Sequence, residues 1–250
     1  MKNQKLFFFI ILVFGILSGS CNKENITIPS DEDILGGIVK PQVIDEYIYP
    51  IRPGTPEWAD LSSYTEMLDA IQIPDSVLKK ISTWGLVESC FKYPLYGDYA
   101  AFNNQVGYIN DLILTFSGFR ELLSREDAPK IILYYYRHWD VSLYPDFMKR
   151  GFIELAIGSD SFLSKLNARQ LLYLISIALE VKGKENEYYT SSFPPYSFFV
   201  MANSMIHYPY KQFLDYCSVV KNPMPDGYFL WRINSSCEKI EGFSRRLLNF

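Results

Sequence analysis

The spacing of apolar residues is helical through most of this chain. From Pro56 onward, apolar positions recur mainly at intervals of three and four, with polar residues between them. The clearest case follows Ser82, where Leu86 and Cys90 lie four residues apart on one face. We expect Ser82 to cap this helix, because its hydroxyl can accept a hydrogen bond from an unpaired backbone N–H. The pattern predicts an all-α fold of antiparallel helical hairpins, arranged as an irregular bundle or an α-solenoid-like stack.

A second amphipathic helix follows closely. Pro94 ends the first helix, because the residue before a proline is pushed out of the helical region. Only the segment 94–104 connects the two helices, so we expect their apolar faces to pack against each other as a hairpin. Glu88 lies off the apolar stripe and is expected on the solvated face. The apolar face of the second helix comprises Ile109, Leu112, Ile113 and Phe116.

The chain also contains an internal similarity. Asp75–Ser82 aligns with Asp160–Asn167 at a constant offset of 85 residues. Each copy describes a short helix, a polar cap and a longer amphipathic helix, which suggests a duplicated helical unit that presents a binding surface. The alternative is that any short helix followed by a cap and a helix gives this pattern, since few residues match.

The N-terminus is typical of a targeting segment. Residues 1–20 combine a positive start with an apolar run too short for a transmembrane helix, and small residues then precede Cys21. This pattern predicts a lipoprotein signal peptide with lipidation at Cys21, and an uncleaved N-terminal anchor is the alternative. Residues 21–55 contain several Pro and Gly and are expected to form a tether, about 30 Å from end to end if it is a flexible coil. Residues 44–51 are a candidate extended segment lying on the domain, and residues 56–250 form the helical domain.

A distinctive stretch runs from Ser82 to Asp98 as Ser-Thr-x-Gly-Leu-Val-Glu-x-Cys-x-x-Tyr-Pro-Leu-x-Gly-Asp. The same pattern includes Phe102–Asn104 behind it and, upstream, Gly54–Trp58, Glu66–Leu68 and Gln72–Pro74. Together these segments resemble an uncharacterised family of bacterial lipoproteins, over roughly residues 55 to 125. Trp84 stands where the resemblance leads us to expect an acidic residue. The resemblance implies a secreted, lipid-anchored helical domain, and it implies no activity. Lys23 and Glu24, just after Cys21, resemble the charged signals that send some lipoproteins to the outer face, so we expect an outer-membrane lipoprotein, with surface exposure as a further expectation.

Composition and charge limit the classes of partner that the protein can bind. The formal charge is −4 and neither sign forms a long block, so binding to nucleic acid has no electrostatic basis. Removal of residues 1–20, whose charged residues are Lys2 and Lys5, changes the formal charge from −4 to −6. The expected partners are the membrane, reached through the lipid anchor, and a protein or glycan at the cell surface.

Residues with catalytic or ligating chemistry are sparse. We expect Cys90 to be a buried thiol, and Cys217 and Cys237 are candidates for a disulfide, with two free thiols as the alternative. Neither histidine, His138 or His207, has a second histidine or a cysteine at ligand spacing, so we expect no metal and no cofactor. No nucleophile elbow, zinc-protease, P-loop or dinucleotide-binding motif occurs.

Three functions remain, and the favoured one is non-enzymatic: partner binding or scaffolding in the cell envelope. A glycan-binding accessory lipoprotein is the alternative, because exposed aromatic rings stack on sugars. A hydrolase is the third, and it would need a deep pocket around Glu88, Asp98 or His138. Most tyrosines are expected to serve core packing, although two groups could form exposed aromatic faces: Tyr134–Tyr136 with Trp139, and Tyr188, Tyr189, Tyr196, Tyr208 and Tyr210.

Overall fold

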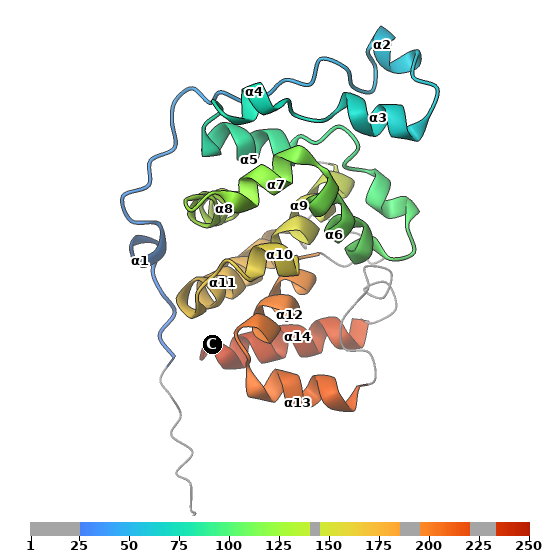
Figure 1. Ribbon diagram of the computed structural model, residues 1–250. Helices are drawn as coiled ribbons and strands as arrows, with labels where there is room; N and C mark the ends of the chain where they lie inside the picture. Colours follow the sequence, from blue (N-terminus) through green and yellow to red (C-terminus); the bar gives the residue numbers. More distant parts are fainter. Residues whose placement is uncertain (1–25, 141–145, 186–195, 221–233) are drawn as a thin grey trace, which may run out of the picture.

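The computed structural model describes residues 26–140, 146–185, 196–220 and 234–250, and every regular element in these ranges is a helix (Figure 1). The predicted all-α fold is confirmed. In chain order the elements are α1 (Asp31–Leu35), α2 (Pro56–Ala59), α3 (Tyr64–Ala70), α4 (Asp75–Leu78), α5 (Thr83–Phe91), the 3-10 helix η1 (Asp98–Ala101), α6 (Gln105–Thr115), α7 (Ser117–Ser124), α8 (Ala128–Arg137), α9 (Phe147–Ile157), α10 (Asp160–Leu163), α11 (Ala168–Glu185), α12 (Ser197–His207), α13 (Lys211–Val219) and α14 (Asn234–Leu247).

The helices follow one another through space roughly in chain order, from α2–α5 at one end of the molecule to α13 and α14 at the other (Figure 1). α5 packs against α7 and α8, α9 packs against α12, and α11 packs against α12 and α14. A single apolar core runs from Ile34 in α1 to Leu248 just after α14. Successive helices therefore share one continuous buried layer.

The helix after Ser82 forms as predicted. The Ser82 hydroxyl accepts from the Gly85 N–H at 3.0 Å, and α5 begins at the next residue, Thr83. Leu86 and Cys90 are fully buried, which confirms the apolar stripe.

The predicted hairpin is corrected by the helix packing. The main contacts of α5 are with α7 and α8, and those of α6 are with α7 and α9, so α7 buries part of both faces. Phe116 lies between α6 and α7, where the backbone is extended, and its ring packs on Tyr93 with centroids 4.9 Å apart. The spacing correctly identified the buried residues, but it could not identify their partner helix.

The two copies of the internal similarity adopt the same local structure. α4 and α10 begin at Asp75 and Asp160, and α5 and α11 begin at Thr83 and Ala168, so both pairs keep the offset of 85 residues. The backbone bonds agree as well: Leu86 N–H donates to the Ser82 carbonyl and Leu171 N–H donates to the Asn167 carbonyl, each at 2.9 Å. We call α4–α5 the first unit and α10–α11 the second unit.

Within the segment expected to form a tether, the candidate residues 44–51 do lie on the helical body, through Asp45, Tyr47 and Tyr49, and the contact extends beyond them to α1. Ile34, Leu35 and Tyr49 are buried in the core, and α1 forms within this segment. Ser30 caps α1 in a capping box with Asp33. The apolar spacing did not predict α1, because a helix of five residues is too short to show a helical period. We call residues 30–49 the strap.

Candidate functional site

The distinctive Ser82–Asp98 stretch includes α5, and the strap packs against this helix. Asp45 accepts a hydrogen bond from the Ser82 N–H at 2.7 Å and a second one from the Ser82 hydroxyl. A Cβ atom on Gly85 would lie 2.4 Å from Asp45 Oδ1 and 2.7 Å from the Asp45 carbonyl oxygen. Gly85 is therefore needed where the strap approaches α5 most closely.

One turn further along α5, Ser89 continues the same contact. Its hydroxyl donates to the Gly85 carbonyl at 2.7 Å and accepts from the Tyr47 N–H at 2.7 Å. The Tyr49 hydroxyl donates to the Ser89 carbonyl at 2.9 Å. The strap thus satisfies polar groups of α5 that the core would otherwise leave unpaired.

Glu88 does not lie on a freely solvated face. Its side chain is 16% exposed, and Oε1 accepts from the Tyr135 hydroxyl of α8 at 2.9 Å. Lys40 of the strap and Lys92 lie 3.6 and 3.8 Å from its carboxylate oxygens. The expectation of a solvated Glu88 is wrong, because the strap and α8 cover the flank of α5 that the apolar pattern left open.

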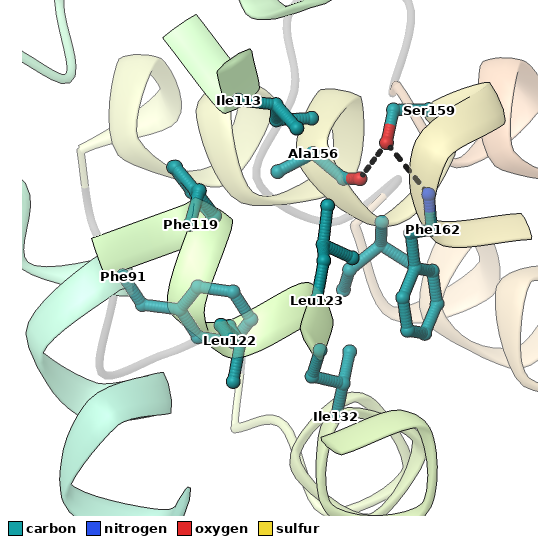
Figure 2. A pocket seen from close by; sticks show the side chains of 10 residues that line it. Phe91, Ile113, Phe119, Leu122, Leu123, Ile132, Ala156, Ser159 and Phe162 are labelled. Atoms are coloured by element: carbon teal, nitrogen blue, oxygen red, sulfur yellow. Dashed lines mark hydrogen bonds between the residues drawn. The ribbon is translucent and has the colours of Figure 1, made fainter. Parts of the chain in front are cut away.

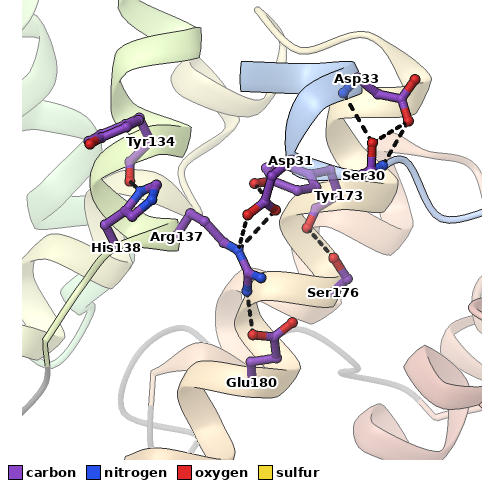
Figure 3. A network of polar contacts seen from close by, with 9 residues as sticks. All are labelled: Ser30, Asp31, Asp33, Tyr134, Arg137, His138, Tyr173, Ser176 and Glu180. Carbon is purple, nitrogen blue, oxygen red and sulfur yellow. Dashed lines mark hydrogen bonds and ion pairs between the residues drawn. The ribbon is translucent and has the colours of Figure 1, made fainter. Parts of the chain in front are cut away.

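At its other end the strap is fixed to α8 and α11 by a polar network (Figure 3). Asp31 accepts from the Tyr173 hydroxyl at 2.8 Å and from Arg137 Nε at 3.0 Å, and Arg137 also pairs with Glu180. Burial alone would raise the pKa of the Asp31 carboxyl, but the bonds from Tyr173 and Arg137 outweigh it and the net pKa lies below the usual value. Asp31 therefore stays ionised and bridges the two helices.

Two further contacts reinforce this end. Arg169 Nη2 lies 2.8 Å from Asp33 Oδ1, and Lys130 Nζ donates to the Gly36 carbonyl at 2.7 Å. The strap consequently crosses both units, with residues 31–36 on the second unit and its neighbour α8, and residues 45–49 on the first.

An aromatic patch lies near α3, η1 and the start of α6. We define it by Tyr64, Asp98, Phe102 and Tyr108. Tyr64 and Phe102 are 46% and 45% exposed. The Tyr64 hydroxyl donates to Asp98 Oδ2 at 2.9 Å, and the rings of Phe102 and Tyr108 lie 4.6 Å apart.

The electrostatics of the patch keep its hydroxyls protonated. Partial burial raises the pKa of Tyr64, and the bond to the Asp98 carboxylate raises it further. Burial also raises the pKa of Tyr108 well above its usual value. The patch thus offers exposed ring surface beside an oriented carboxylate, and the exposed amides of Asn103 and Asn104 adjoin it in the chain. The sequence does not predict this pairing, because Tyr64 and Asp98 are more than thirty residues apart in the chain.

The tyrosines that the sequence suggested as exposed faces mostly serve packing. Tyr136, Trp139 and Tyr196 are buried. Tyr134, Tyr135, Tyr208 and Tyr210 are half-buried against the core. Tyr188 and Tyr189 lie outside the described residues.

A buried polar cluster on α9 also escaped the sequence pattern. Glu154 is fully buried and its Oε1 accepts from the Tyr136 hydroxyl at 2.7 Å, while Arg150, one turn earlier, is 3% exposed. Neither side chain lines the cavity described next.

A small apolar cavity of about 20 Å³ is lined by side chains from α5 through α10 (Figure 2). Ser159 is its one hydroxyl-bearing lining residue, and that hydroxyl already donates to the Ala156 carbonyl at 2.7 Å. A space of this size holds about one water molecule and is a packing gap in the core. Neither Glu88, Asp98 nor His138 lines it; the other lining residues are Phe91, Ile113, Phe119, Leu122, Leu123, Ile132, Ala156, Ile157 and Phe162.

The histidines occupy separate structural positions. His138 follows α8, where its Nδ1 lies 2.9 Å from the Tyr134 carbonyl oxygen, and His207 Nε2 lies 3.0 Å from Asp160 Oδ1. Within the described ranges, no group of three side chains is arranged to hold a metal ion.

All three cysteines of the described ranges are free thiols, which is the second alternative for Cys217 and Cys237. Cys90 is fully buried, as predicted, and burial raises the pKa of its thiol well above the usual value. Burial raises the pKa of Cys237 to about 11. These thiols are therefore protonated at neutral pH. Cys21, the expected lipidation site, lies outside the described residues.

Comparisons with protein-family models, curated proteins and solved structures found no match to this chain. In the part of the chain that the structure describes, no helix combines the length and the apolar character needed to cross a membrane.

Proposed function

We propose that this chain is a lipid-anchored protein of the bacterial cell envelope, held by Cys21, whose helical body binds a partner or scaffolds a surface assembly. The observation that carries the proposal is the aromatic patch. Tyr64 and Phe102 expose ring surface at the end of the body that includes α3. Ile26, the described residue nearest Cys21, is bonded to Asn249 just after α14, and α14 lies toward the opposite end (Figure 1). A partner-binding surface is most useful on the side that faces away from the anchor.

The contacts of the distinctive stretch support binding over catalysis. Ser82, Gly85 and Ser89 are engaged with the strap, and Glu88 with Tyr135 and Lys40. The four residues thus have structural roles, and these roles explain why they occur in the Ser82–Asp98 stretch. A hydrolase remains the less favoured proposal.

The anchor is tested with Cys21→Ala. We expect this variant to leave the membrane fraction or to keep its signal segment, and mass spectrometry of the wild type should find a lipid on Cys21. A variant that is processed and membrane-bound like the wild type would contradict the lipoprotein proposal.

The binding surface is tested on the lipidated protein purified from native membranes. We expect a co-purifying partner to be lost from the Tyr64→Ala/Phe102→Ala variant and kept by the control Val39→Ala/Val219→Ala, which removes two even more exposed apolar side chains elsewhere. Loss from both variants, or from neither, would remove the patch from the binding surface.

Glycan binding is the second candidate, and the bond between Tyr64 and Asp98 favours it. That bond places a carboxylate acceptor beside an exposed ring, and sugars are bound by such combinations of stacking and hydrogen bonding. We expect Asp98→Asn to weaken binding to a soluble polysaccharide while leaving a protein partner attached. Equal loss of both ligands would argue against a sugar site.

A further inference from the structure

The folded body begins close to the proposed lipid site. Ile26, the first described residue, is five residues from Cys21, and five residues of extended chain span at most about 18 Å. This is shorter than the coil expected from the sequence, because the chain already packs against the body at Ile26 and Ile28. If Cys21 carries the lipid, as the proposed function holds, the surface around Ile26 cannot move far from the membrane.

The surface around Ile26 is formed mainly by the C-terminal end of α14. Asn249 Nδ2 donates to the Ile26 carbonyl at 3.1 Å, so the attachment point and the end of α14 lie side by side, as Figure 1 also shows. Ile26 and Ile28 are half-buried against the core and Pro29 is buried, which fixes this part of the chain in place.

The side chains displayed there suit an anionic lipid surface. Arg245 and Arg246 are exposed, and Phe250 is 71% exposed. The Phe250 N–H donates to the Arg245 carbonyl at 2.9 Å, which holds the backbone of Phe250 against the last turn of α14. Arg246 lies over the Phe243 ring at 4.4 Å and Arg245 pairs with Glu241, and Lys182 shares that carboxylate.

The local charge contrasts with that of the whole chain. The chain without residues 1–20 has a formal charge of −6, yet the last turn of α14 carries two arginines and no acidic residue. Each basic side chain near an anionic membrane strengthens binding by about fivefold, and aromatic rings favour the headgroup region.

We propose that the α14 end of the body, comprising Ile26, Arg245, Arg246 and Phe250, rests against the anionic phospholipid headgroups of the membrane that holds Cys21. The opposite end, with α2 and α3, then faces away from that membrane. The lipid and the basic aromatic surface act together, so that one acyl anchor gives a fixed orientation.

Hydrogen exchange on the lipidated full chain tests this orientation. The protein is reconstituted in vesicles of phosphatidylethanolamine with phosphatidylglycerol, and in vesicles of phosphatidylcholine. We expect the amides of 245–250 to exchange at least fivefold more slowly in the anionic vesicles, and those of 56–70 to exchange equally in both. Arg246→Gln and Phe250→Ala should each reduce this slowing, while Val219→Ala, another exposed position, should keep it.

The outcomes separate the two proposals. Absence of a lipid on Cys21, with no flotation on vesicles, overturns the anchor and this orientation together. A lipidated, floating protein whose 245–250 amides exchange equally in both vesicles overturns the orientation alone. Slowing at 56–70 in place of 245–250 would mean that the other end faces the membrane. Because Phe250→Ala changes an exposed ring, its result does not depend on a variant that fails to fold.

Discussion

The first and second units begin with matching caps but complete them with different residues. In the second unit the cap is self-contained: the Asn167 side chain accepts from the Gln170 N–H and the Gln170 side chain accepts from the Asn167 N–H, each at 3.0 Å. In the first unit Ser82 accepts from the Gly85 N–H, but its own N–H donates to Asp45 of the strap at 2.7 Å. Gly85 stands at the position that Gln170 occupies in the second unit.

This difference shows that a residue distant in the chain can replace part of a local capping motif. A capping box normally takes both acceptors from the first turn of its own helix. In the first unit Asp45 replaces the second acceptor, so position 85 no longer needs a long polar side chain. The same approach of Asp45 leaves no room for one. The first unit therefore depends on the strap, while the second unit caps itself.

The largest expected effect tests what the two units share. Leu86 and Leu171 occupy matching positions and are 0% and 4% exposed. Replacing either by Ala should lower the free energy of unfolding by about 3 kcal/mol, through lost burial and the cavity left behind. Chemical denaturation followed by circular dichroism measures this. The exposed Leu114→Ala is the control, and a loss below about 1 kcal/mol at one unit only would break the correspondence.

The next effect tests the position where the units differ. Gly85→Ala places a Cβ atom against the Asp45 backbone and should destabilise the protein by about 2 kcal/mol, although alanine favours helices. Gly183→Ala in α11 is the matched control, because no atom lies within 4 Å of its new Cβ, and it should stabilise by about 0.5–1 kcal/mol. A neutral or stabilising Gly85→Ala would mean that the strap is not held closely against α5.

The same comparison explains how much the sequence could predict. The caps at Ser82 and Asn167 and the offset between units follow from local spacing, and the structure confirms them, because caps act within one turn. The partner of Ser82 lies 37 residues away, and no local pattern specifies it. The glycine at position 85 acquires its explanation only once Asp45 is placed beside it.

The packing faces of the helices and the aromatic patch also depend on residues that are distant in the chain. An apolar stripe shows that a residue is buried but not against which helix, so α7 between α5 and α6 was not expected. The patch formed by Tyr64 and Asp98 depends on α3 meeting η1, and single tyrosines in a sequence do not distinguish exposed rings from packed ones.

A smaller effect separates the two capping mechanisms. Asp45→Ala removes the acceptor of two hydrogen bonds and Gln170→Ala the acceptor of one, and each should lower the free energy of unfolding by about 1 kcal/mol, measured by thermal unfolding. They should differ in limited proteolysis: Asp45→Ala should expose cleavage sites near 40–48, and Gln170→Ala should not. Equal cleavage of the strap in both variants would show that Asp45 does not hold it.

The smallest effect distinguishes the two caps by pH. Burial raises the pKa of the Asp45 carboxyl, but the bonds from the Ser82 hydroxyl and N–H outweigh it, and the folded-state pKa lies below the ordinary value of about 4. A carboxyl whose pKa is lowered by folding contributes stability above its unfolded pKa and loses it as the pH falls through the folded-state pKa. The cost of Asp45→Asn should therefore be present at pH 7 and disappear as the pH falls through the lowered folded-state pKa of Asp45. Gln170 does not titrate, so the cost of Gln170→Ala should stay constant over the same range.

Both stability differences are measured against wild type at each pH. This comparison cancels the loss of stability that Asp31 and Asp33, whose pKa values are also lowered, cause in every variant. A cost of Asp45→Asn that is unchanged at low pH would mean that the charge of Asp45 plays no part in the cap, and the strap would then hold the first unit by packing alone.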